Sequence, residues 1–196
     1  RSARVVAFIA VAALTIVIYW GGLHGPFLID DIPNLDTIQR WVEGRLNWRS
    51  AIDNRSGPLG RSVSMLSFLA DAARSGTMDP ATFKTTNLVV HIACGALSYV
   101  FCRQVFRRMD STRQVASVCA LFVAAWWLLI PLHVSTVLYI VQRMAQLGAF
   151  FTLLGLTTYV AIRQRMERGS STILMLTLWT VFPLIVGIGA LAKENA

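Results

Sequence analysis

The sequence predicts an all-α, polytopic helical membrane protein with about five transmembrane helices and a long first outer loop that carries amphipathic surface helices. Hydrophobic residues make up 55% of the 196-residue chain and charged residues only 14%, whereas soluble domains carry about 25% charged residues. Apolar runs long enough to cross a bilayer recur along the chain. The net charge of +8 falls in short basic clusters between these runs, which is the positive-inside pattern of membrane proteins rather than a nucleic-acid-binding face.

The first predicted span covers residues 5–23 and ends in an interfacial Tyr19-Trp20 pair. It is longer than the apolar core of a signal peptide and lacks an A-x-A exit, so we expect it to be retained. The outer loop, residues 24–85, is too polar to cross a membrane. It contains two stretches with helical spacing of apolar residues, and we expect both to be amphipathic helices that lie on the membrane surface or pack on the spans. Their apolar stripes are Leu35, Ile38, Trp41, Val42 and Leu46, then Val63, Leu66, Leu69, Ala70 and Ala73.

The remaining spans are predicted at residues 86–106, 115–130, 137–162 and 172–191. The fourth is interrupted by polar residues, and Pro183 is expected to kink the fifth. If every span crosses, nine arginines gather on one side: Arg1, Arg4, Arg103, Arg107, Arg108, Arg113, Arg163, Arg165 and Arg168. This bias predicts a cytoplasmic N-terminus, with the long loop and the Lys193-Glu194 pair on the opposite, outer side.

Asp30 and Asp31 are the first candidate site residues, because they follow the first span directly. Adjacent carboxylates repel each other, so a structural reason for such a pair at a membrane surface is not obvious. They could act as a base or hold a hard divalent cation through oxygen ligands. The alternative is that they are solvated loop residues that cap a helix beginning near Asn34.

Polar residues inside the spans are the second set of candidates, because such groups usually face a cavity or the bundle interior. Asn87, His91 and Ser98 share one helical face, and Arg143 and Gln146 share another. A helix–helix hydrogen bond and a snorkelling arginine are the alternatives for His91 and Arg143. Carboxylates and cations on one side of a membrane suit transfer from a lipid-linked phosphate, since a base activates a hydroxyl and a cation stabilises the departing phosphate.

A series of short motifs runs in order through nearly the whole chain: Gly25-Pro26-Phe27, Asp30-Asp31, Asn34, Gly60-Arg61, Asn87-Leu88, His91, Pro131-Leu132-His133, Gln142-Arg143 and Lys193-Glu194. This series resembles the GT-C superfamily of membrane glycosyltransferases, in particular the protein O-mannosyltransferase-like group with its bacterial pilin-type members. Members of that group have about twice as many spans. We therefore expect residues 1–196 to be the N-terminal part of a longer GT-C-like transmembrane domain.

The resemblance implies transfer of a sugar from a polyprenyl-phosphate donor to an acceptor hydroxyl of a protein, glycan or lipid, on the non-cytoplasmic membrane face. It makes Asp31 or Asp30 the catalytic carboxylate, and Asp31 is the favoured base of the two. It also implies donor phosphate or sugar contacts for a further set of residues: Arg61, His91, Arg143, Lys193, His133, Gln142 and Glu194. A divalent metal ion, if one is used, would bind at Asp30 and Asp31.

At three places the sequence differs from that group, and these differences bear on which sugar is donated and on the kind of organism. Ser62 stands where many relatives have proline, Lys84 where histidine is common, and Val134-Ser135 replaces the usual continuation after Pro131-Leu132-His133. These differences argue against mannose and favour a bacterial inner-membrane enzyme with a periplasmic active site. The alternatives are a transporter or lipid flippase subunit with polar residues along a substrate path, and an assembly protein with no site.

Overall fold

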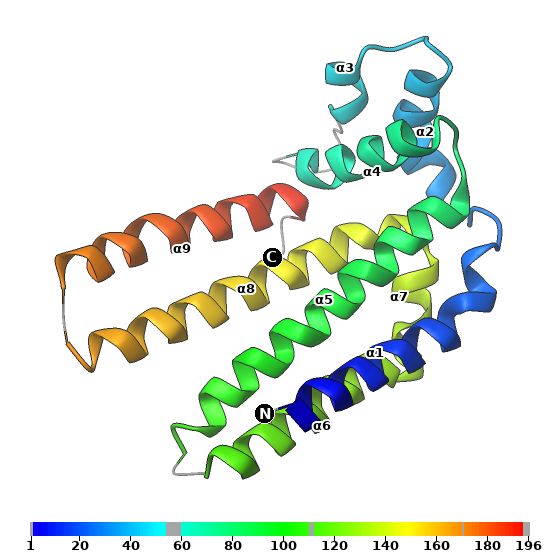
Figure 1. Ribbon diagram of the computed structural model, residues 1–196. Helices are drawn as coiled ribbons and strands as arrows, with labels where there is room; N and C mark the ends of the chain where they lie inside the picture. The colour runs from blue at the N-terminus through cyan, green and yellow to red at the C-terminus, as the bar shows by residue number, and fades with distance from the viewer. Residues whose placement is uncertain (1, 54–59, 110–111, 170, 194–196) are drawn as a thin grey trace.

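The computed structural model describes residues 2–53, 60–109, 112–169 and 171–193, so Glu194 and Arg1 lie outside the described residues (Figure 1). Every regular element in this part of the chain is helical. The long helices are α1 (Ser2–Leu23), α5 (Pro80–Phe106), α6 (Arg113–Leu129), α8 (Arg143–Met166) and α9 (Thr172–Ala192). The short elements are α2 (Asp31–Val42), α3 (Trp48–Ile52), α4 (Ser62–Ser75), α7 (Val134–Leu138) and the 3₁₀ turns η1 (Pro131–His133) and η2 (Ile140–Gln142).

Four described helices are long and apolar enough to cross a membrane: Ala3–Leu23, Pro80–Phe106, Ile140–Met166 and Thr172–Ala192. A fifth is added if α6 and its continuation Pro131–Leu138, bent by 46°, form one span. Large apolar side chains on these helices face outward, among them Trp179 and Ile173, each 74% exposed. Exposed apolar helices of this length have lipid as their natural solvent. The predicted all-α polytopic membrane fold is therefore confirmed.

Helix α5 lies at the centre of the long helices, with α6 and α1 packed on one side and α8 on the other, while α9 packs on α8 (Figure 1). Gly95 allows the close approach of α5 and α6, because a Cβ atom there would lie 2.7 Å from the Leu128 side chain. The connections α5–α6 and α8–α9 lie at the end of the bundle near the N-terminus, which we call the arginine end (Figure 1). We call the opposite end, which carries α2, α3 and α4, the loop end.

The loop end is a small helical cluster with its own apolar core. Leu35 and Ile38 from α2, Met65 and Phe68 from α4, and Phe83 from α5 are all buried there. Local capping interactions determine where two of its helices begin or end. The Asn47 side chain accepts a hydrogen bond from the Ser50 N–H at the start of α3, and Gly76, with φ 69°, ends α4 in the left-handed conformation. The Ser64 hydroxyl donates to the Ala192 carbonyl at 2.8 Å, which joins α4 to the end of α9.

The face of α4 that is buried within the protein is not the apolar stripe identified in the sequence. Of that stripe only Leu69 is buried, and Leu66 is 53% exposed. The buried face is instead formed by Ser64, Met65, Phe68, Leu69, Asp71 and Ala72. The physical reason is that Asp71 of α4 pairs with a buried arginine on α8. This ion pair turns the Asp71 face of α4 toward the protein, so that the most apolar face of the helix is not the buried one.

Two helix boundaries also differ from the predicted spans. The span predicted at residues 86–106 lies within α5, which begins at Pro80, because the Asp79 carboxylate accepts hydrogen bonds from the Ala81 and Thr82 N–H groups. The span predicted at residues 137–162 contains a break. Tyr139 has an extended conformation between α7 and η2, and the continuous helix begins only at Arg143.

Candidate functional site at the loop end

Asp31 is fully buried at the first position of α2, and both carboxylate oxygens accept backbone hydrogen bonds. Oδ2 accepts from the Leu28 N–H and Oδ1 from the Val141 N–H, each at 2.8 Å. The carboxylate thus joins the chain after α1 to the break between α7 and α8, 110 residues further on. Backbone N–H groups that point at a carboxylate stabilise its charge. Asp31 therefore acts as a clamp that holds the chain before α2 against η2.

Lys84 lies beside this clamp and supports the same segment. Its ammonium group donates to the carbonyl oxygens of Gly25 and Pro26 at 2.7 and 3.0 Å, and the side chain is 2% exposed. A buried ammonium needs such partners, because an unpaired charge in the interior is costly. The segment from Gly25 to Asp31 is thus fixed at both ends by buried charged groups.

Asp30, in contrast, has an exposed side chain. It occupies the N-cap position of α2, but its carboxylate makes no capping hydrogen bond. Its backbone is held on both sides, since its N–H donates to the Tyr139 hydroxyl at 2.9 Å and its carbonyl accepts from the Asn34 amide at 2.8 Å. The pKa of the Tyr139 phenol lies above its ordinary value, because desolvation and the adjacent Asp30 carboxylate disfavour the phenolate. Asp30 is therefore an exposed carboxylate on a fixed backbone.

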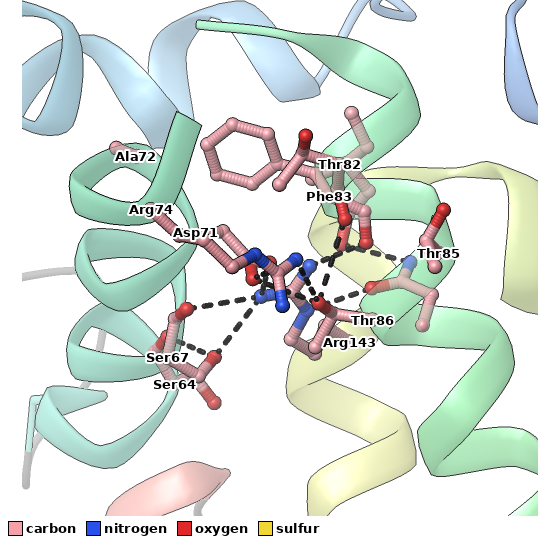
Figure 2. Close-up of polar contacts among 12 residues, drawn as sticks. Ser64, Ser67, Asp71, Ala72, Arg74, Thr82, Phe83, Thr85, Thr86 and Arg143 are labelled. Atoms are coloured by element: carbon pink, nitrogen blue, oxygen red, sulfur yellow. Dashed lines mark hydrogen bonds and ion pairs between the residues drawn. The ribbon is translucent and has the colours of Figure 1, made fainter. Parts of the chain in front are cut away.

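Arg143 is the largest fully buried side chain, with 0% exposure. Its guanidinium forms an ion pair with Asp71 of α4 at 2.6 Å (Figure 2). Nε donates to the Asn87 side-chain oxygen at 2.7 Å, Nη2 to the Phe83 carbonyl at 2.5 Å, and Nη1 to the Ser67 carbonyl at 3.2 Å. Arg143, the first residue of α8, is thus bound to both α4 and α5.

Aromatic rings and a second polar side chain complete the surroundings of Arg143. The guanidinium carbon lies 4.6 Å from the Phe68 ring centroid and 5.8 Å from that of Phe83. The Asn87 amide nitrogen donates to the carbonyls of Val137 and Tyr139, each at 3.1 Å. At the break after α7 the regular helical hydrogen bonds are interrupted, and Asn87 supplies a donor to both carbonyls, although the Tyr139 carbonyl also accepts from the Gln142 N–H at 3.1 Å. Arg143 and Asn87 therefore hold the break in one conformation, and the guanidinium has no exposed surface.

His91 and His133 meet in an aromatic cluster with Trp127 of α6. The ring centroids of His91 and His133 are 5.3 Å apart, and those of Trp127 and His133 are 4.5 Å apart. His91 is 2% exposed, with Nε2 3.3 Å from the Leu128 carbonyl oxygen, whereas His133 is half-buried. Of the two predicted histidines, His133 is the one with accessible surface.

A cavity of about 350 Å³ lies next to this cluster, between α6 and α8. Trp127 lines it from α6, the small residues Ala145, Gly148 and Ala149 line it from α8, and Lys193 supplies a cation where α9 ends. The buried Trp127 indole N–H has no hydrogen-bond partner among the described residues. The cavity therefore combines apolar walls with an ammonium group, the two features that a lipid-linked phosphate requires.

The other predicted site residues lie near these groups. Arg61 is half-buried at the N-cap of α4, with Nη1 3.4 Å from the Met144 sulfur. Gln142 is half-buried and directly precedes Arg143. Among the described residues, no three His, Cys, Asp or Glu side chains lie close enough to hold a metal ion. Glu194, the remaining predicted residue, lies outside the described residues.

Asp71 was not predicted from the sequence, although it is 4% exposed and central to the buried network. Besides Arg143 it contacts Arg74 at 3.1 Å and accepts from the Thr86 hydroxyl at 2.7 Å (Figure 2). A signal was available, since Asp71 is the one charged residue in the run from Ser62 to Ala73. A lone carboxylate in such a run is a candidate partner for a buried cation.

Comparisons of the chain with protein-family models, with curated proteins and with solved structures give no match. The fold establishes an integral membrane protein of the all-α polytopic class. The loop end carries an exposed carboxylate, a half-buried histidine and a cation-bearing cavity.

Proposed function

We propose that this protein is a GT-C-type glycosyltransferase that moves a sugar from a polyprenyl-phosphate donor to an acceptor hydroxyl at the loop end of its helices. The observation that carries the proposal is the contrast between the two adjacent carboxylates. Asp31 is buried and clamps the backbone, while Asp30 is exposed on that same fixed backbone. A catalytic group needs an accessible side chain on a rigid support, and Asp30, rather than the Asp31 favoured from the sequence, meets both conditions.

The donor is assigned to the cavity between α6 and α8. A polyprenyl chain would lie against Ala145, Gly148 and Ala149, and the phosphate would contact the Lys193 ammonium at the loop end. The Ser64 hydroxyl of α4 donates to the Ala192 carbonyl, immediately before Lys193. Lys193 is thereby connected to the helical cluster of the loop end, in which Asp30 precedes α2. His133 and Arg61 are assigned to the sugar or phosphate.

In the proposed reaction Asp30 accepts the proton of the acceptor hydroxyl as its oxygen attacks the anomeric carbon of the sugar. The bond between that carbon and the phosphate oxygen breaks, and polyprenyl phosphate leaves with the negative charge. Lys193 stabilises this charge as it develops. Asp31, Arg143 and Asn87 are positioning residues, because they hold Asp30 and the α7–α8 break without contacting substrate.

We further propose that the loop end faces the periplasm of a bacterial inner membrane. The arginine end would then be cytoplasmic, in accord with the positive-inside bias. The acceptor, whether protein, glycan or lipid, would approach from the periplasmic side.

The test measures sugar transfer by the full-length protein in liposomes supplied with a panel of radiolabelled polyprenyl-phosphate sugars. Asp30→Asn is expected to lower transfer about 100-fold or more, the usual contribution of a general base, without changing the melting temperature. Asp31→Asn is expected to lower both transfer and melting temperature. Asp36→Asn is the matched control, since Asp36 lies on the same helix in an exposed pair with Arg40, and it should change neither.

Full transfer by Asp30→Asn would refute the assignment of the base. Absence of transfer with every donor, together with movement of a lipid-linked sugar across the bilayer, would favour the transporter or flippase alternative instead.

A further inference from the structure

Five arginines from four helical regions line one cavity of about 600 Å³ at the arginine end. Arg4 comes from α1, Arg103 and Arg107 from the end of α5, Arg113 from α6, and Arg168 follows α8. The Arg4 guanidinium donates to the Arg113 carbonyl at 3.3 Å, and Arg103 Nε donates to the Ser117 hydroxyl at 3.1 Å. These contacts fix two of the side chains at the cavity. The five arginines therefore line one defined cavity and are not merely separate surface charges that set the membrane topology.

Among the described residues that line this cavity, none is acidic. The nearby Glu167 carboxylate is engaged by Arg108, which does not line it. Five like charges around one hollow repel each other, and an anion inside would relieve that repulsion. Guanidinium groups bind phosphate oxygens in a bidentate manner, so a phosphate group is the anion that the cavity fits best.

An apolar groove of about 170 Å³ continues from this cavity between α1 and α5. The two share Arg4, Val5 and Tyr99, and the groove extends along Phe8, Ala96 and Val100. Because α1 and α5 are membrane-spanning helices, this groove is at the depth of lipid acyl chains. A free phosphate ion would use the arginines alone, whereas a phospholipid would use both the arginines and the groove.

We propose that the arginine end binds an anionic phospholipid, with its phosphate among the five arginines and an acyl chain in the groove between α1 and α5. Basic pockets between transmembrane helices are established sites for such headgroups in general. The bound lipid would connect α1, α5, α6 and α8 at this end, opposite the proposed transferase site. Its binding is independent of sugar transfer, so each proposal can fail alone.

The test measures retention of phosphatidylglycerol by the full-length protein, using native mass spectrometry after exchange into detergent, with phosphatidylcholine as the neutral comparison. Arg103→Gln combined with Arg107→Gln is expected to weaken phosphatidylglycerol retention at least tenfold. The matched control is Arg163→Gln combined with Arg165→Gln, which removes the same charge from exposed positions near the end of α8 outside the cavity. Arg168→Gln, beyond the end of α8, is a second variant that leaves every helix intact.

Two further arms separate a lipid from a free anion. Ala96→Leu fills the groove and is expected to weaken phosphatidylglycerol retention while leaving the thermal shift caused by inorganic phosphate unchanged. Equal losses in the cavity and control double variants would overturn the site, because they would show a general charge effect. Stabilisation by inorganic phosphate equal to that by phosphatidylglycerol, with no effect of Ala96→Leu, would overturn the lipid assignment.

Discussion

The buried Arg143–Asp71 pair gives the sharpest test of the fold. Arg143→Met keeps the length and apolar character of the side chain but removes the guanidinium, which is 0% exposed and contacts Asp71, Asn87 and the Phe83 carbonyl. Removal of one partner from a buried ion pair costs about 3–5 kcal/mol, because the other charge is left without compensation. Asp71 keeps its contacts with Arg74 and Thr86, so we expect the lower end of that range, about 3 kcal/mol.

The double variant Arg143→Met with Asp71→Leu removes both charges. We expect it to be more stable than the sum of the single effects by about 2 kcal/mol, within the usual range of coupling for contacting residues. Full recovery is not expected, since the Asn87 oxygen and the Phe83 carbonyl still lose a donor, at about 1 kcal/mol each.

The assay is reversible unfolding in mixed detergent micelles, followed by circular dichroism. Arg40→Met is the matched control, because Arg40 pairs with Asp36 at 2.9 Å on an exposed face and such pairs contribute less than about 1 kcal/mol. If Arg143→Met unfolds like Arg40→Met, or if the single effects simply add, the buried network does not stabilise the fold as argued.

Two further predictions concern single helices. Asp79→Ala should cost about 1 kcal/mol as a lost N-cap. The Thr82 hydroxyl donates to the Asp79 carboxylate and lowers the pKa of Asp79 below its ordinary value, so this contribution is present above the ordinary carboxyl pKa and disappears as the pH falls through the lowered pKa. In acid titrations the variant should therefore lose less stability than the parent, and a parallel acid loss would contradict the prediction. Gly95→Ala should destabilise by about 1–2 kcal/mol in thermal unfolding, since its Cβ would lie 2.7 Å from Leu128. Leu128 is fully buried, so Leu128→Ala also destabilises, but the double variant should lose less stability than the sum of the two single losses. Equal melting temperatures for Gly95→Ala and the parent would show that the α5–α6 packing adjusts to the added methyl group.

The hydrophobic pattern was sufficient to predict the fold class and the long helices, because lipid exposure makes whole helices apolar. It did not show which face of α4 packs on the protein, since Leu66 of the apolar stripe is 53% exposed whereas Asp71 is buried. The direction that α4 faces depends on the ion pair of Asp71 with Arg143, 72 residues away in the sequence, and helical periodicity contains no information on such a partner. The break at Tyr139 was missed for a related reason, since it is stabilised by the distant side chains of Asp31 and Asn87.

The candidate site was found from the sequence as a set of polar residues, but their roles could not be separated. Asp30 and Asp31 are adjacent in sequence, and only the structure distinguishes the exposed carboxylate from the one that accepts two backbone N–H groups. Likewise, the sequence gives no reason to distinguish Arg143 from Lys193 as cations of the candidate site. One is fully buried in a network, whereas the other lines a cavity with apolar walls.

Asp31, Lys84 and Asn87 bind backbone carbonyl or N–H groups of two irregular segments, the chain before α2 and the break after α7. Arg143 in turn donates to the Asn87 side-chain oxygen. Irregular backbone close to a membrane needs such side chains, because lipid offers no hydrogen bonds. Most of the polar motif residues therefore support the backbone at the loop end. In the proposed function the chemistry is assigned to groups with accessible surface at that end, and Asp30 is the exposed carboxylate whose backbone these side chains hold in place.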